Sequence, residues 1–394
     1  MRILFLAPQP FMTQRGTPLA TKMLLETLSK RGYFMDVLIY PEGEDIIIDR
    51  CTFTRVPALP GLANIKPGFS LKKLCADIVM FPMIVWKMMR NRYDLVIAVE
   101  ESAYFAMILK PIFRVPYVFD VDSSIPEQIN DKFDPPSWVN KLLERSEGAA
   151  SMHALGAIAC CRELGRTITG YAPDLPVQVL EDITMLGDMD AAHVPDDLDI
   201  DVPIVMYVGN LESYQGVGLL VDAFARVDLE ENPAHLVVIG GSADHISAHQ
   251  AQANSLGIPD AVTFLGPRPV DWLTDYLKGA AITVSPRTQG RNTPMKIYSY
   301  LDSGRALLAT RLTTHTQVLD DEISMLVEPT PDDMARGLRE LLQNVGMREK
   351  MGQLARERVA AEFSPDAYAR KVATFFDNVV EPKLGLSTKN EPAS

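Results

Sequence analysis

The feature that most constrains the fold is a repeated alternation between short apolar runs and longer amphipathic stretches. Apolar runs of about four to eight residues suit strands and are short for buried helices. Val, Ile and Leu dominate these runs, which is typical of strands buried on both faces of a parallel sheet with helical crossovers. The alternation occurs in two series along the 394 residues, so the sequence predicts an α/β protein with two doubly wound domains.

The first series predicts an N-terminal domain over residues 1–185. A helix is expected after the first run, because Thr17 and Pro18 suit a helix start and Gly32 suits its end. The predicted strands are 2–7, 35–40, 94–99, 116–121, 156–160 and 177–180.

An acidic segment separates the two series. From Glu181 to Asp201 the chain has eight acids and no Lys or Arg, so a linker is predicted over 186–202. Two domains also fit the length, since a single core rarely extends beyond roughly 250–300 residues.

The second series predicts a C-terminal domain over 203–365, with a C-terminal helix at 366–382 and a flexible polar tail at 383–394. Two such domains are expected to face a cleft, because open parallel sheets bind ligands beyond the carboxyl ends of their strands. The predicted strands are 202–209, 235–240, 262–266, 282–285, 306–310 and 325–328. The predicted helices are 217–228, 244–256, 270–278, 294–303, 331–344 and 347–361.

Composition and motifs exclude several classes of function. Lys and Arg number 38 against 51 Asp and Glu, and a net charge of −13 disfavours a nucleic-acid partner. Four cysteines without metal-site spacing suit a reducing, cytoplasmic compartment. The first strand is not followed by a G-x-G-x-x-G loop, and no P-loop, G-x-S-x-G or H-E-x-x-H motif occurs. No cofactor is therefore expected.

Two loops of the N-terminal domain carry candidate site residues. Arg15 and Gly16 precede a helix start, where backbone amides favour an anion. Asp120 and Asp122 form a D-x-D pair at a strand end, which can hold a divalent metal. A role for Asp122 near the acceptor without a metal, and a purely structural role, are the alternatives.

The segment 285–310 has the most specific pattern. A strand ends at Ser285, and a helix is expected to begin near Pro294. Cations at the positive end of a helix are unfavourable without an anion, so this loop predicts a phosphate or diphosphate ligand. The residues predicted around that anion are Arg287, Gly290, Arg291, Asn292, Thr293 and Lys296.

These segments resemble a family-4-type GT-B glycosyltransferase. The resemblance covers most of the chain and is strongest over 204–363, where YVGNLESYQG, LVVIGG, VTFLG and SPRTQGRNTPMKIYSYLDSGRALLAT occur in order. It implies two Rossmann-like domains around a cleft, a nucleotide-sugar donor, retention of anomeric configuration and no metal. It also implies that 366–382 packs back on the N-terminal domain.

The chain departs from the family pattern at its charged positions. Many relatives have two glutamates, one near the donor sugar and one on the ribose, and the matching positions are Arg291 and Ser299. The diphosphate-binding cations of relatives match Asn210 and Gln215, and the cleft histidine matches Asp122.

We interpret the cations of 285–310 as replacing the missing ones from the other side of the diphosphate. The predicted catalytic residues are Arg287, Lys296 and Asp122. The predicted donor-binding residues are Arg15, Gly16, Gly209, Asn210, Gln215, Gly241, Arg268, Gly290, Arg291, Asn292, Thr293 and Ser299.

The predicted function is sugar transfer from a nucleotide-sugar to a hydroxyl of a sugar or lipid-linked acceptor, in glycan or glycolipid synthesis. A non-catalytic nucleotide-sugar-binding or regulatory GT-B protein is the alternative, and a GT-B epimerase or phosphorylase is a third.

A basic segment at 66–92 predicts peripheral contact with an anionic membrane at its cytoplasmic face. It holds six cations and one acid around an apolar stretch that contains Trp86. The alternative is a core helix with solvated ends.

Overall fold

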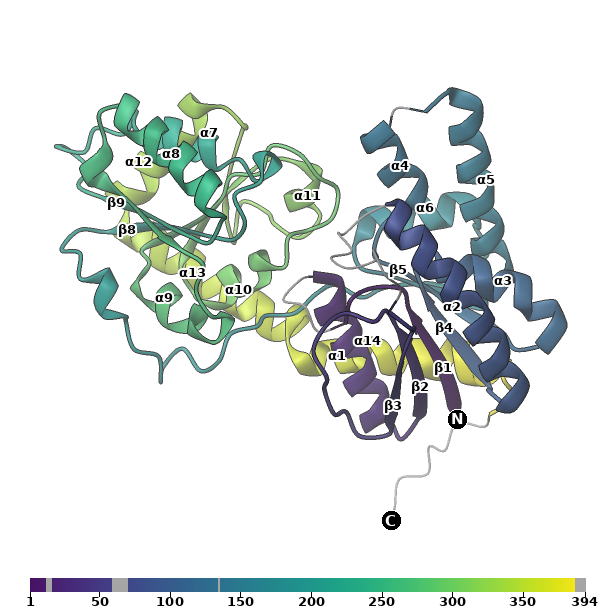
Figure 1. Ribbon diagram of the computed structural model, residues 1–394. Coiled ribbons are helices and arrows are strands. Elements are labelled where there is room, and N and C mark those ends of the chain that lie inside the picture. The colour runs from purple at the N-terminus through teal and green to yellow at the C-terminus, as the bar shows by residue number, and fades with distance from the viewer. Residues whose placement is uncertain (12–15, 59–69, 134, 387–394) are drawn as a thin grey trace, which may run out of the picture. The chain divides into compact units, whose positions relative to one another are not determined.

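The computed structural model describes residues 1–11, 16–58, 70–133 and 135–386, and it contains two compact units (Figure 1). Unit 1 comprises Met1–Glu181 and Ala369–Ser394, and unit 2 comprises Asp182–Tyr368. Each unit has its own parallel sheet covered by helices, which confirms the predicted α/β class with two Rossmann-like domains.

Unit 1 is built on a sheet with the strand order β3-β2-β1-β4-β5-β6-β7 in the described residues. The order reverses between β1 and β4, and the carboxyl edge at such a reversal is where doubly wound sheets usually bind ligands. The strands are β1 (Arg2–Ala7), β2 (Phe34–Ile39), β3 (Cys51–Arg55), β4 (Leu95–Val99), β5 (Tyr117–Val121), β6 (Gly156–Ala159) and β7 (Val177–Val179).

Helices cover both faces of this sheet (Figure 1). They are α1 (Gly16–Lys30), α2 (Leu71–Arg90), α3 (Ser102–Phe113), α4 (Ile125–Phe133), α5 (Ser137–His153) and α6 (Arg162–Tyr171). The central strands are buried throughout, which is why their sequences read as continuous apolar runs. The edge strand β3 was not predicted, because CTFTR alternates polar and apolar residues and pairs only with β2.

Unit 2 has the strand order β10-β9-β8-β11-β12-β13 in the described residues. The strands are β8 (Ile204–Val208), β9 (His235–Ile239), β10 (Val262–Gly266), β11 (Ile282–Ser285), β12 (Ala306–Thr310) and β13 (Met325–Val327). Separate apolar clusters lie on its two faces. The order reverses between β8 and β11, so the loops after these strands meet at one edge.

The helices of unit 2 alternate with its strands. They are α7 (Val217–Phe224), α8 (Ala243–Ser255), α9 (Leu273–Gly279), α10 (Lys296–Asp302), α11 (Thr313–Thr316), α12 (Pro331–Gln343) and α13 (Val345–Arg358). The helix expected from Pro294 thus begins at Lys296, after a short loop that leaves Thr293 and Pro294 buried.

The acidic segment predicted as a linker belongs to unit 2 and is held along it. Backbone N–H groups of this segment bond to side chains of α9 and α10, so it is not a freely moving connection. The three bonds run from Met185 to Ser299, from Gly187 to Thr274 and from His193 to Asp275.

The chain ends on unit 1. Beyond α14 (Pro365–Phe375), Asp377 and Glu381 both accept hydrogen bonds from Arg31, and Tyr33 donates to Glu381. Lys383 ends α15 (Glu381–Lys383) and donates to the Leu155 carbonyl at 2.8 Å. The tail predicted from 383 therefore does not begin there, and residues 387–394 of that prediction lie outside the described residues.

Among the described residues, no helix has the length and apolar character needed to cross a membrane.

The contact between β6 and the end of α14 gives a stability prediction. A Cβ on Gly156 would lie 2.8 Å from Cζ of the buried Phe375 ring, whereas a Cβ on Gly170 in α6 would meet no atom within 4 Å. We expect Gly156→Ala to destabilise unit 1 by ~1–3 kcal/mol. Gly170→Ala should be neutral or slightly stabilising, because alanine favours a helix. Urea unfolding of both variants tests this, and equal midpoints would contradict it.

Candidate anion site of unit 2

Lys296 and Arg287 come together at the carboxyl edge of the unit 2 sheet. Arg287 follows β11, and Lys296 is the first residue of α10. The Lys296 Nζ donates to Gln215 Oε1 at 3.2 Å and lies 3.9 Å from the centroid of the Tyr207 ring. The ammonium group is thus held between β8, the loop before α7, and α10.

Arg287 is fixed by a loop carbonyl and a hydroxyl. Its Nη1 donates to the Asn292 carbonyl at 2.8 Å and to Thr314 Oγ1 at 3.0 Å, and its guanidinium lies over the Tyr214 ring at 5.3 Å. Its Nε is buried and has no hydrogen-bond partner. A buried donor without an acceptor is unfavourable, so this atom is available to a ligand.

Neither cation has a counter-charge in the described part of the chain: no carboxylate forms an ion pair with Arg287 or Lys296 there. Burial, and then the charge of Arg287, hold the pKa of Lys296 well below its ordinary value. Burial also lowers the pKa of Arg287. Both residues are half-buried, and two like charges so close together and partly removed from water are costly unless an anion compensates them, which makes this edge a candidate anion site.

Two glycines leave room for the cations. A Cβ on Gly209 would lie 2.6 Å from Lys296 Nζ, and a Cβ on Gly290 would lie 2.9 Å from Arg287 Nη1. Both residues have positive φ, 149° and 125°, which side chains rarely adopt. The predicted roles of both glycines therefore have a steric basis here.

His315 fixes the loop that carries Arg287 through a chain of hydrogen bonds. Its ring nitrogens lie 2.9 Å from Ser285 Oγ and 2.8 Å from the Thr310 carbonyl, and Thr310 Oγ1 donates to the Arg287 carbonyl at 2.6 Å. Because Nδ1 must donate to the carbonyl, Nε2 accepts from the serine hydroxyl. Burial lowers the pKa of His315 to about 4, so the ring is neutral near pH 7.

The remaining predicted residues of this loop border the same site. The Asn292 carbonyl accepts from Arg287 and from Thr314, and the buried Thr293 hydroxyl has no hydrogen-bond partner. Arg291 is exposed, and its carbonyl accepts from Gln317 at 2.7 Å.

Two other predicted donor-binding residues form hydrogen bonds within unit 2. Ser299 is fully buried, and its hydroxyl accepts from the Met185 N–H at 3.2 Å. Arg268 donates to Asp197 at 3.1 Å and to Tyr276 at 2.9 Å. Both side chains thus anchor the acidic segment, a role that the sequence did not reveal.

Asn210 and Gly241 lie after β8 and β9. The Asn210 carbonyl accepts from Tyr207 at 2.6 Å, and its amide oxygen accepts from the Glu212 N–H at 3.3 Å. A Cβ on Gly241 would lie 2.5 Å from the Leu211 side chain. Close packing therefore accounts for this glycine.

The other predicted site residues, Arg15, Gly16 and Asp122, belong to the N-terminal part of the chain and not to unit 2. Arg15 is outside the described residues, and Gly16 is the first residue of α1. Asp122 is buried directly after β5, and burial raises the pKa of Asp120 to about 7. In the described ranges, no three His, Cys, Asp or Glu residues form a metal-binding group, so the D-x-D interpretation gains no support.

Sequence reasoning missed an ionic group at the carboxyl edge of the unit 1 sheet. Lys73 Nζ lies 2.9 Å from both Glu100 Oε2 and Glu101 Oε1, and Ser123 donates to Glu100. Burial and the neighbouring Glu100 raise the pKa of Glu101 to about 8. Glu100 has a φ of 48°, which is strained for a non-glycine residue. Two acids directly after the apolar run 94–99 were the available signal.

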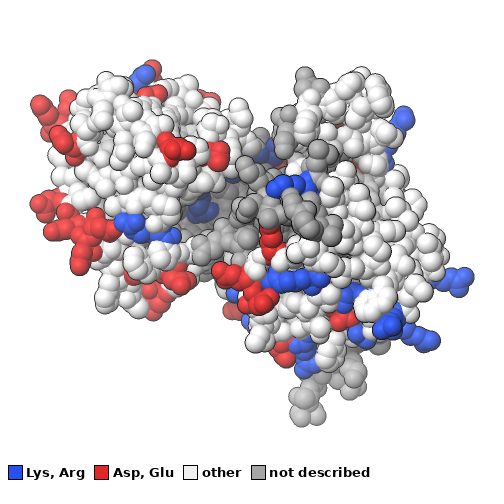
Figure 2. Space-filling view, viewed as in Figure 1, with Lys and Arg blue, Asp and Glu red and all other residues white. Residues whose placement is uncertain are grey.

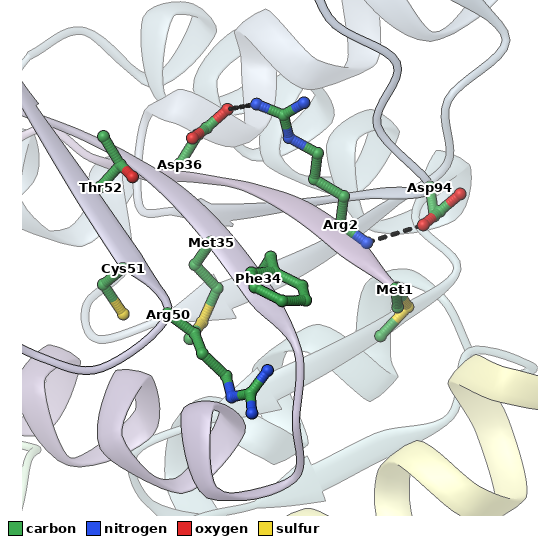
Figure 3. Close-up of a pocket in the computed structure, with 9 residues that line it drawn as sticks. All are labelled: Met1, Arg2, Phe34, Met35, Asp36, Arg50, Cys51, Thr52 and Asp94. Atoms are coloured by element: carbon green, nitrogen blue, oxygen red, sulfur yellow. Dashed lines mark hydrogen bonds and ion pairs between the residues drawn. The ribbon is translucent and has the colours of Figure 1, made fainter.

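A pocket of 730 Å³ lies at the opposite edge of unit 1, beside the amino ends of its strands (Figure 3). Its charged groups are already paired, since Arg2 donates to Asp36 at 2.8 Å and the Arg2 N–H donates to Asp94 at 2.7 Å. Ligands of doubly wound sheets bind at the carboxyl edge, so the anion site of unit 2 is the stronger candidate.

Comparison with known proteins gives a family match over the region that contains the candidate anion site. The family Glycosyl transferases group 1 matches residues 202–344, which include the whole anion site. A D-inositol 3-phosphate glycosyltransferase of Corynebacterium jeikeium is 28% identical, over 96% of this chain and 94% of its own length. Most other curated relatives match over about half of their length or less.

Solved structures share the fold of nearly the whole chain. Sucrose-phosphate synthase from Thermosynechococcus elongatus has a TM-score of 0.75 and 19% identity, covering 95% of this chain and 98% of its own. Anabaena Alr3699/HepE in complex with UDP has a TM-score of 0.73 and 16% identity, covering 95% and 99%. These likenesses establish a shared architecture.

The neutral His315 predicts a pH-dependent stability for unit 2. Its folded pKa of about 4 lies below the ordinary value of 6.5, so the unfolded chain binds more protons between these values. Stability should fall as pH drops through that range, by up to about 1.4 kcal/mol per unit. His315→Gln should lack this part of the pH dependence. Urea unfolding of both proteins at several pH values tests it, and parallel pH profiles would contradict it.

Proposed function

We propose that the chain is a GT-B glycosyltransferase that transfers a sugar from a nucleoside diphosphate donor to an acceptor hydroxyl, with retention of anomeric configuration. The observation that carries the proposal is the half-buried pair Arg287 and Lys296, which has no carboxylate partner in the described residues. A nucleoside diphosphate supplies the anion that such a pair requires.

The proposed catalytic task of these residues is electrostatic. As the bond to the donor sugar breaks, negative charge grows on the departing diphosphate. In the proposed reaction, the Arg287 Nε and Lys296 Nζ stabilise that charge from fixed positions in a half-buried site, where charge interactions are stronger than in bulk water. We propose that these two cations take the place of a divalent metal beside the phosphates.

The proposed acceptor chemistry follows from the same geometry. In a retaining reaction of this type, the departing phosphate takes the proton of the acceptor hydroxyl, so the site needs no carboxylate nucleophile. This agrees with the neutral or basic residues at Arg291 and Ser299. Asp122 is proposed to act near the acceptor, although it is buried after β5.

We further propose that the acceptor is a sugar or a lipid-linked sugar, met in the cytoplasm or at the cytoplasmic face of a membrane. A non-catalytic nucleotide-sugar-binding protein is the second candidate, and the absence of both family glutamates favours it. The two candidates share the anion site and differ in turnover.

Charge removal at the anion site tests donor binding. Lys296→Met and Arg287→Met should each weaken UDP binding by ~1.5–3 kcal/mol, the range for hydrogen bonds to charged groups, or roughly 10–150-fold in Kd. Lys350→Met is the matched control, because Lys350 is exposed on α13. Calorimetric titration with UDP, GDP and ADP measures the change. Unaltered affinity in both site variants would remove the assignment.

Turnover separates the two candidates. An active transferase should slowly hydrolyse its donor sugar nucleotide without an acceptor, and EDTA should leave that rate unchanged. Hydrolysis is followed by release of the nucleoside diphosphate, with Lys296→Met as the negative control and Lys350→Met as the positive one. Tight donor binding without turnover toward any acceptor would favour the binding protein.

A further inference from the structure

Helix α2 carries two apolar faces, and only one of them is buried in unit 1. Ala76, Met80, Ile84 and Met88 repeat every four residues and are buried. A second row of apolar side chains on the same helix is exposed: Leu74 46%, Ile78 66%, Trp86 51% and Met89 74%. Pro82 completes the spacing of this row and is also exposed. Such an exposed apolar row on a soluble domain indicates an interaction surface.

The exposed row continues onto α3. The rings of Phe81 and Phe105 join the two helices, with centroids 5.3 Å apart. Ile108 and Ile112 follow Phe105 at helical spacing and are 52% and 67% exposed. We name this surface, with its exposed residues on α2 and α3, the α2–α3 face.

The exposed charged side chains of the α2–α3 face are all positive. Asp77 is the only acid in either helix, and it is buried. Two of the cations counted in 66–92 are withdrawn from solvent, since Lys73 pairs with Glu100 and Glu101 and Lys87 is buried. Residues 66–69 lie outside the described residues.

Exposed cations gather where the two helices end. Arg90 and Arg92 lie at the end of α2, and Arg114 follows α3. The Arg90 guanidinium lies over the Trp86 ring at 4.9 Å, so a cation and an interfacial aromatic share one position. Figure 2 shows Lys and Arg at the outer edge of unit 1 among largely uncharged surface.

We propose that the α2–α3 face docks on the surface of an anionic lipid bilayer. Apolar side chains with Trp86 would enter the interface, and the three arginines would contact lipid headgroups. A second copy of the same face is a poorer occupant, because it would oppose arginines to arginines. Membrane docking itself does not depend on the proposed function. Only the suggestion that docking brings the protein to a lipid-linked acceptor rests on that function.

Vesicle co-sedimentation tests the docking surface. The protein should pellet with vesicles of phosphatidylcholine mixed with phosphatidylglycerol, pellet far less with phosphatidylcholine alone, and be released by salt, which screens surface charges. The triple variant Ile78→Gln, Trp86→Gln, Met89→Gln should partition into vesicles about tenfold or more weakly, because it removes apolar side chains that would enter the bilayer. Arg90→Gln with Arg92→Gln should weaken the preference for anionic vesicles, because only Arg114 of the three arginines remains.

The matched control is Trp272→Gln with Met347→Gln, which removes exposed apolar side chains from unit 2 and should leave vesicle binding unchanged. UDP titration of each variant checks folding and separates this inference from the proposed reaction. Absence of the wild type from anionic pellets at low salt would overturn the proposal. Equal partitioning of the triple variant and the wild type, or self-association without vesicle binding, would also overturn it.

Discussion

The candidate site of unit 2 depends on one electrostatic constraint, the partial burial of two basic side chains that have no carboxylate partner among the described residues. Arg287 and Lys296 approach from β11 and α10, and the positive end of α10 adds to their field. This arrangement disfavours the protonated form of Lys296, and a bound anion would favour that form again. In the proposed function, these two side chains provide the fixed positive charge that a departing diphosphate requires.

Several local features follow from that constraint. The strand order reverses between β8 and β11, which brings Gly209 and the Arg287 loop to one edge. Gly209 and Gly290 lack the side chains that would collide with the cations. His315 fixes the loop while staying neutral, so it adds no third positive charge to the site.

The sequence was informative where burial alone decides structure. The central strands were predicted correctly because both of their faces are buried. The cations of 285–310 were predicted to share an anion because they lie near a helix start, and the structure brings Arg287 and Lys296 to the same sheet edge. The edge strand β3 was not predicted because it is half-polar.

The roles of Ser299 and Arg268 were missed because they depend on the path of the acidic segment. Likewise, the pairing of Lys73 with Glu100 needs a contact that joins α2 to the end of β4. Apolar periodicity also could not tell that α2 has one buried and one exposed row.

Proton uptake during UDP binding tests the central claim most directly. If a diphosphate is the missing counter-charge, it must raise the depressed pKa of Lys296, so binding should take up protons from solution. Calorimetry in buffers of different ionisation enthalpy measures this uptake above about pH 7, where a terminal phosphate with a second pKa of about 6 is already ionised. The account predicts proton uptake in the wild type and none in Lys296→Met. Binding of equal strength without proton uptake, or with the same uptake in both proteins, would contradict it.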